Sequence, residues 1–276
     1  MKKITLFLAT ALCIATTYAQ NTLNLQKGQK YAVENKVTTV SSTEVQGQSM
    51  ETNVNATTTY NVEVSDVTPT NISLNNTISR MVMNMSMMGQ EMNFDSDKKE
   101  DLNGQMGSTF KDYIMKTMVV NLDKSGKVIP AKKEDAKEET NPVLKSLGDF
   151  ETQGFGAQLA FQALPAGLKV GSSWTSDLNT SSTKNTTKYT VTSIAGDLAT
   201  LAIDGKMSAE MEMEQQGMQM TTKTKGTITG SQVVNMKTGV IQSNTTTVNA
   251  DGNVEVMGQD LPVTTKTTST TTVKAI

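Results

Sequence analysis

The sequence predicts an all-β protein with minor helix, built from two repeated antiparallel β half-barrel or sandwich units joined by a short helical segment. Threonine is unusually frequent, and its β-branched side chain favours the extended chain over the helix. Apolar and polar residues alternate over segments such as 60–64 and 198–203. Asp204-Gly205 and Asp251-Gly252 are turn signals, so hairpins should join the strands. We expect the threonine-rich face to meet solvent and the Val, Ile, Leu and Met face to be buried.

The first 19 residues have the features of a cleavable signal peptide. A positive start, Met1-Lys2-Lys3, precedes an apolar run over 4–15, and Ala19 is the small residue at the expected cleavage site. The run is about a dozen residues long, whereas a helix that spans a bilayer needs roughly 20. We therefore expect export to the periplasm, to an outer-membrane-associated position or out of the cell, and a mature chain that is not membrane-spanning.

The missing residue types exclude several kinds of chemistry. The chain has one Cys, Cys13, and no His. Cys13 lies inside the apolar run and follows Leu12, whereas a lipidated cysteine follows small residues, so we interpret it as part of the leader. Export then leaves no disulfide, no thiolate or imidazole ligand, and no Ser-His-Asp or Cys-His relay. Because 25 Lys and Arg balance 27 Asp and Glu, the chain has no basic field to bind nucleic acid.

The mature chain is predicted to contain two β-units. The first covers 21–130, a charged and helical linker covers 131–164, and the second unit covers 165–276. The first unit should include a short helix near 108–118, because Ser108 can cap it and the following apolar residues have helical spacing.

The predicted linker has two parts. Residues 131–140 are charged and almost free of large apolar side chains, so this part should be solvated. Residues 142–164 carry apolar residues at helical spacing and end before Pro165, which predicts a second short helix.

An internal repeat relates the two β-units. Four blocks recur in the same order: Lys27–Tyr31 and Val170–Trp174, Thr58–Val62 and Thr187–Val191, Met81–Met92 and Met211–Met220, and Val119–Val128 and Val233–Val240. Tyr31 and Trp174 occupy matching places, so we expect them to seal the two cores. The competing interpretation is that threonine-rich strand pairs look alike by composition alone.

Several short motifs carry a family resemblance: Leu164-Pro165 after the helical pattern, Val170-Gly171-Ser172-Ser173-Trp174, Gly28 after the leader, and the Asn235–Gly239 turn. With them the chain resembles a family of exported bacterial β-rich proteins of unknown function. The resemblance covers most of the mature chain and implies an exported β-rich fold. It implies no catalytic residues, because none are assigned to such a family.

Methionines alternate along predicted strands in both units, so that their side chains should share one face. The candidate ligand-binding residues are Met81, Met83, Met85, Met87, Met92, Met211, Met213, Met218 and Met220. Three interpretations stay open: core packing by unbranched thioethers, a pliable groove for lipids or other apolar ligands, and Cu(I) held by three thioethers. Without His or Cys no stronger ligand completes a copper site, so we assign neither a metal site nor a cofactor.

The carboxylates offer no clear catalytic arrangement. Asp95-Ser96-Asp97 is followed by two lysines and lacks the third ligand and glycine of an EF-hand, so we interpret the loop as solvated. No phosphate-binding or dinucleotide motif occurs. A carboxylate pair can hydrolyse glycosides without His, but such sites usually offer aromatic platforms, and here aromatics are scarce and spread singly. We therefore expect a protein that is not an enzyme and has no catalytic residues.

The function predicted from these observations is an exported, non-enzymatic envelope protein that binds an apolar, lipid-like ligand. The alternative is a structural or interaction module of the cell envelope or surface, whose strands add to an envelope protein partner. Copper binding through methionine is a minor alternative. The expected partners are thus an apolar small molecule or lipid, or an envelope protein, and no nucleic acid.

Overall fold

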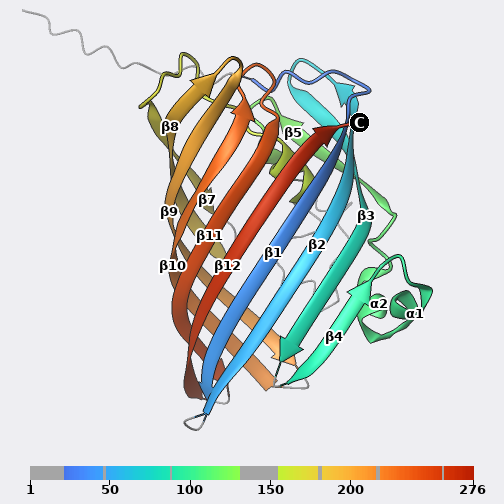
Figure 1. Ribbon diagram of the computed structural model, residues 1–276, viewed down its shortest axis with the longest axis vertical. Coiled ribbons are helices and arrows are strands. Elements are labelled where there is room, and N and C mark those ends of the chain that lie inside the picture. The colour runs from blue at the N-terminus through green and yellow to red at the C-terminus, as the bar shows by residue number, and fades with distance from the viewer. Residues whose placement is uncertain are drawn as a thin grey trace, which may run out of the picture.

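The computed structural model describes residues 22–45, 48–87, 89–130, 155–179, 182–215, 218–256 and 258–276. Twelve strands form one antiparallel sheet, which is strongly curved and not closed (Figure 1). The prediction of an all-β protein with minor helix is therefore confirmed. The predicted signal peptide over 1–19 and the charged segment over 131–140 lie outside the described residues.

The described residues run up and down through long strands and include three short helices. The strands are β1 Lys30–Val45, β2 Gln48–Val67, β3 Asn71–Met87, β4 Gln90–Asp95, β5 Thr117–Asp123, β6 Val128–Ile129, β7 Ser173–Asn179, β8 Thr183–Ala195, β9 Leu198–Gln215, β10 Met218–Asn235, β11 Ile241–Val256 and β12 Gln259–Ala275. The helices are α1 Lys99–Asn103, α2 Gln105–Phe110 and α4 Phe155–Ala160. In the sheet the order is β6-β5-β3-β2-β1-β12-β11-β10-β9-β8-β7, and β4 pairs with the lower part of β3.

The two halves of the chain share this single sheet. The first strand pairs with the last, from Tyr31 opposite Ala275 to Thr43 opposite Val263. This pairing satisfies backbone groups that would otherwise form two exposed sheet edges. The predicted β-units are thus continuous through β1 and β12, as the adjacent blue and red strands in Figure 1 show.

Both halves begin with the same turn. Gly28 and Gly171 have positive φ angles of 89° and 88°, which glycine adopts without strain. Each donates its N–H, at 2.8 Å, to the carbonyl oxygen of a valine: Gly28 to Val64 and Gly171 to Val191. A β-bulge follows each of these valines in its pairing with the next strand. The two valines are therefore equivalent positions.

Two further details recur in both halves. The hydroxyl of the bulge residue, Ser65 or Thr192, donates to a carbonyl oxygen of the next strand at 3.0 and 3.1 Å. The turns that follow β5 and β10 are each organised by one side-chain oxygen, which accepts backbone N–H groups from the turn. That oxygen belongs to Asp123 in the first half and to Asn235 in the second. The sequence match between Asn121 and Asn235 is therefore wrong by two residues.

The same offset affects the second repeat block. Because Val64 corresponds to Val191, Tyr60 corresponds to Thr187, whereas the sequence match paired it with Tyr189. A shift of two residues along a strand keeps every side chain on its face. Alternation of polar and apolar residues therefore could not distinguish the two alignments.

The helices begin and end at places other than those predicted. Ser108 lies inside α2, which begins at Gln105, and the chain leaves the helix after Phe110. It does so because Met115 donates its N–H to Ile78 of β3 at 2.8 Å and Thr117 begins the pairing of β5 with β3. Of the helical pattern predicted over 142–164, the described part contains α4, and residues 142–154 lie outside it.

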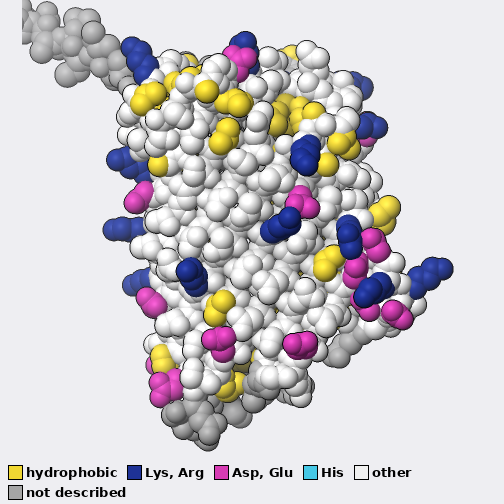
Figure 2. Space-filling view, viewed as in Figure 1, with side chains coloured by type: hydrophobic (Ala, Val, Ile, Leu, Met, Phe, Trp, Pro, Cys, Tyr) yellow, Lys and Arg dark blue, Asp and Glu magenta, His cyan; other side chains and the backbone are white. Residues whose placement is uncertain are grey.

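Two sequence expectations about faces and turns are wrong. Thr267 and Thr268 are successive residues of β12 and so point to opposite faces, and each hydroxyl lies within hydrogen-bond distance of a threonine on a neighbouring strand. Threonine therefore lines the interior as well as the outer face, which Figure 2 shows as largely polar with scattered charges. Gly205 and Gly252 lie inside β9 and β11 instead of in turns. A Cβ at Gly252 would meet the Lys223 carbonyl of the next strand, so these glycines permit the sheet to bend.

The apolar core fills one end of the curved sheet and has two clusters. Leu23, 2% exposed, belongs to the larger cluster. Its side chain lies against both equivalent turns, since a Cβ at Gly126 or at Gly239 would contact it. Its N–H also donates to the Lys124 carbonyl at 2.9 Å. The segment before β1 therefore links the two halves at the end of the sheet that holds the apolar core.

Candidate functional site

A cavity of about 1050 Å³ lies inside the second half of the sheet. Its apolar wall comes from the inner face of β7 to β11 and from the segment that follows α4: Trp174, Tyr189, Ile203, Ile228, Ile241 and Phe161. Residues of β6 and of β7, which lie at opposite ends of the sheet order, both line it. The cavity therefore lies at the gap that this open sheet leaves between β6 and β7, which we call the seam.

Two glycines of β9 and β10 leave space beside the isoleucines that line the cavity. Gly205 lies opposite Ile228 and Gly230 lies opposite Ile203 in the strand register. Each isoleucine therefore has a neighbour without a side chain on the adjacent strand. A Cβ at Gly230 would meet the Thr245 carbonyl oxygen and would lie 2.9 Å from the Cα of Thr246. Glycine is thus needed here both for the curvature of the sheet and for the open space above it.

A row of polar side chains crosses the inner face of β10, β11, β12 and β1 beside the cavity. Gln232 and Asn244 are opposite each other, and Asn244 is opposite Thr271, which in turn is opposite Asn35. The Gln232 amide donates to the Gln162 side chain at 2.7 Å, and Thr271 donates to Asn35 at 3.1 Å. These hydrogen bonds offset part of the cost of burying the row, whereas the side-chain oxygen of Asn244 is buried without a hydrogen-bond partner among the described residues.

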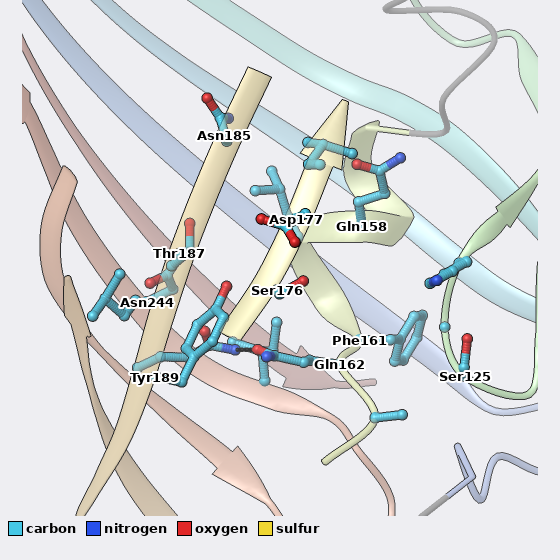
Figure 3. A pocket seen from close by; sticks show the side chains of 18 of the residues that line it. Ser125, Gln158, Phe161, Gln162, Ser176, Asp177, Asn185, Thr187, Tyr189 and Asn244 are labelled. Atoms are coloured by element: carbon cyan, nitrogen blue, oxygen red, sulfur yellow. Dashed lines mark hydrogen bonds between the residues drawn. The ribbon is translucent and has the colours of Figure 1, made fainter. Parts of the chain in front are cut away.

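Ionisable groups are few among the described lining residues. Asp177 and Lys127 are the carboxylate and the ammonium group of the lining, and they come from the two sides of the seam. Asp177 accepts a hydrogen bond from the Thr186 hydroxyl at 2.7 Å. Burial raises the pKa of Tyr189 above its usual value, so its phenol stays protonated at neutral pH. Figure 3 shows Asp177 and Gln158 on the seam side of the cavity and Tyr189 on the sheet wall.

Aromatic contacts differ between the equivalent positions Tyr31 and Trp174. Tyr31 is 5% exposed and packs edge-on against Phe161, with ring centroids 5.3 Å apart. Trp174 stacks on Tyr189 at 5.4 Å and lines the cavity. Tyr31 seals its core as expected, whereas Trp174 also faces open space.

The predicted methionine site lies elsewhere on the inner face. Met81 is 5% exposed in the larger core cluster, and Met83 packs against that cluster. Met85 lies opposite Met92 in the register. Of the remaining candidates, Met85 and Met220 are half-buried, Met87 and Met92 are exposed, and the side chains of Met211, Met213 and Met218 lie outside the described residues. None of the described methionines lines the cavity, so a role of these residues in ligand binding stays a prediction.

Sequence reasoning missed the residues that form the cavity wall. Ile203 and Ile228 follow the ordinary alternation of a half-buried strand, so they carried no signal of their own. The neighbouring glycines were the available signal, because glycine within a strand often marks a bend or a close approach.

The described residues hold no group of three or more His, Cys, Asp or Glu side chains placed to bind a metal ion. The predicted acidic loop is instead tied together by Arg80, which contacts Asp95 and Asp97 at 3.0 Å each. These hydrogen bonds and charges hold the pKa of Asp95 below its usual value. In the described part of the chain, no helix has the length and apolar character required to cross a membrane.

The sequence matches a family model over residues 69–137 and 130–241, and that family is described as a family of unknown function (DUF6263). The chain belongs to this family. The resemblance seen in its motifs, to a family of unknown function, is thereby confirmed. Comparison with curated proteins finds no match.

Comparison with solved structures gives a likeness of fold to part of one lipid-associated protein and a weak alignment with an outer membrane channel. Lipovitellin, from a structure titled as a study of lipid–protein interactions, aligns with 91% of this chain at a TM-score of 0.51 and 8% identity. The chain spans 25% of the lipovitellin chain, so the likeness concerns the fold of one part of that protein. An outer membrane channel from Pseudomonas putida F1 aligns over 92% of this chain and 98% of its own, with 7% identity and a TM-score of 0.26.

Proposed function

We propose that this protein is an exported, non-enzymatic protein of the cell envelope that holds an apolar, lipid-like ligand inside its curved sheet. The observation that carries the proposal is the cavity of about 1050 Å³, whose mixed lining includes an apolar stretch of Trp174, Tyr189, Ile203 and Ile228. Its size is at the upper end of the roughly 300–1,000 Å³ common for ligand pockets. The leader-like first 19 residues support export.

The lining favours binding over catalysis. Its carboxylate, Asp177, and its ammonium group, Lys127, come from opposite sides of the seam, and the chain has no His to act as a base. Burying about ten methylene groups would contribute about 8 kcal/mol, and this corresponds to a dissociation constant of about 1 μM before ordering costs are subtracted. An alkyl chain of ordinary lipid length therefore suffices for specific retention.

The likeness to lipovitellin adds a fold-level argument. That protein is described by its lipid–protein interactions and shares the curved antiparallel sheet. The inner face of a curved, open sheet is a long surface on which an apolar ligand can lie. This surface exists in the folded protein without any rearrangement of side chains. The inner-face methionines would extend this surface toward the far end of the sheet.

Two adjacent threonines of β11 provide a matched test. Thr246 lines the cavity, whereas Thr245 is exposed on the other face of the same strand. Thr246→Phe should fill part of the cavity and weaken binding of the apolar dye N-phenylnaphthylamine at least about tenfold, the effect of losing about 1.4 kcal/mol. Thr245→Phe should leave the affinity unchanged. Equal affinity in both variants, with native circular dichroism, would argue against the cavity as the ligand site.

The exposed edge of the sheet keeps a second candidate function open. β7 is the terminal strand of the sheet, and most of its side chains are exposed. An unpaired strand edge is a template for a strand of a partner protein. If the protein is an interaction module, dye binding should be absent and Leu178→Pro, which disrupts the β7 edge, should abolish capture of an envelope protein.

A further inference from the structure

The inner face of the sheet is covered by α4 in the first half and lines a cavity in the second half. In the first half, α4 and the segment after it cover the inner face of β1 to β3. A Cβ at Gly156 would lie 2.7 Å from the Tyr60 ring and 2.7 Å from the Asn76 side-chain oxygen. Phe161 completes this contact on Tyr31. This inner surface is therefore fully occupied by the chain's own helix.

The same surface in the second half is open. From the equivalence of Val64 with Val191, the counterparts of Tyr31, Tyr60 and Asn76 are Trp174, Thr187 and Ile203. The register agrees, because Val62 lies opposite Tyr31 and Asn76, and its counterpart Tyr189 lies opposite Trp174 and Ile203. All three counterparts line the cavity. Among the described residues, none fills this place as α4 does in the first half, so the cavity is the equivalent of the place that α4 occupies.

The two ends of the cavity differ in chemistry. At the deep end, Trp174 and Tyr189 pack against the smaller core cluster. At the seam, the lining includes Lys127, Gln158 and Ser176, and Figure 3 shows Gln158 on α4 and Ser176 on β7. Leu178 of β7 lines the cavity and is 49% exposed, so apolar surface reaches solvent at this opening.

We infer that the ligand is an amphiphile with a long alkyl chain, which enters through the seam and lies where α4 lies in the first half. Its alkyl chain extends toward Trp174, and its polar group stays at the seam beside Lys127 and Gln158. The inference rests on the proposed function and adds the class of ligand, its direction and its route of entry. Solvent and polar groups at the seam keep the head group hydrated, whereas an inverted ligand would expose its alkyl end to water there.

Fluorescence of Trp174 tests the direction of the ligand, because it is the single tryptophan of the chain. Two stearic acids are compared, one with a nitroxide near the methyl end and one with a nitroxide next to the carboxylate. The inference predicts saturable quenching that is stronger with the methyl-end probe. Equal or reversed quenching would overturn the direction while leaving the proposed function intact. No saturable quenching by either probe would overturn both.

A blocked seam tests the route of entry. In a Cys13→Ser background, Leu178→Cys is compared with Val119→Cys, which is 66% exposed on β5 and does not line the cavity. After reaction with a polyethylene glycol maleimide, the Leu178→Cys protein should bind the methyl-end probe at least about tenfold more slowly, and the control should bind at the unmodified rate. Equal association rates in both labelled proteins would show that the ligand enters elsewhere.

Discussion

Replacing Leu23 by alanine should destabilise the whole sheet, because this side chain links the two halves. Leu23 is 2% exposed and lies against the turns at Gly126 and Gly239. Truncating a buried leucine to alanine costs about 3 kcal/mol when the surroundings relax little. At roughly 2–4 °C per kcal/mol for a chain of this size, the melting temperature should fall by about 6–12 °C.

Thermal unfolding followed by circular dichroism measures this effect. Val170→Ala is the control, because Val170 is 64% exposed and directly precedes the turn at Gly171, and it should change the free energy of unfolding by less than about 0.5 kcal/mol. A fall of only 1 or 2 °C for Leu23→Ala, similar to that of the control, would refute the role assigned to Leu23.

Three further changes test other parts of the structure. Burial tends to raise the pKa of Asp123, but hydrogen bonds from the Ser125 hydroxyl, the Lys127 N–H and the Ser125 N–H together outweigh burial, so the pKa is lowered. The charged carboxylate therefore stabilises the folded protein fully above about pH 3.9, and this stabilisation is lost as the pH falls below that value. In Asp123→Asn, which copies Asn235, the melting temperature should therefore depend less on pH between about 5 and 3, and an unchanged slope would contradict this assignment. Gly230→Ala should cost about 1–3 kcal/mol in urea denaturation, because β10 and β11 must separate, while the exposed Ser231→Ala should be neutral. Gly156→Val should destabilise the first half by pushing α4 away from Tyr60, and an unchanged melting temperature would show that α4 does not need this close approach.

Sequence reasoning predicted the kind of strands, several of the turns and the recurrence of features in both halves, because these depend on local alternation and on glycine or Asx turn chemistry. It did not predict the pairing of β1 with β12, because these strands are more than 200 residues apart and no local sequence pattern specifies which strands pair. It also placed turns at Asp204-Gly205 and Asp251-Gly252, where the chain continues as a bent strand. A glycine that bends a strand and a glycine that ends one look the same in a single sequence.

The residues of the candidate site were likewise not predictable from local sequence patterns. The methionines drew attention because their alternation predicts a shared face, and Met81 and Met83 do lie together on the inner face beside the core. The cavity instead depends on α4, which covers one half of the sheet and has no counterpart over the other half in the described residues. That difference involves α4, a segment distant in sequence from the strands it covers, so the residues of the cavity wall could be recognised only in the folded chain.

Native mass spectrometry of the protein purified from its own cell envelope tests the central claim most directly. The wild-type protein and Thr245→Phe should carry a stoichiometric adduct that is extracted by organic solvent, and Thr246→Phe should lose most of it. Bare protein mass in all three preparations, or an adduct retained equally by Thr246→Phe, would contradict the account of a ligand held inside the curved sheet.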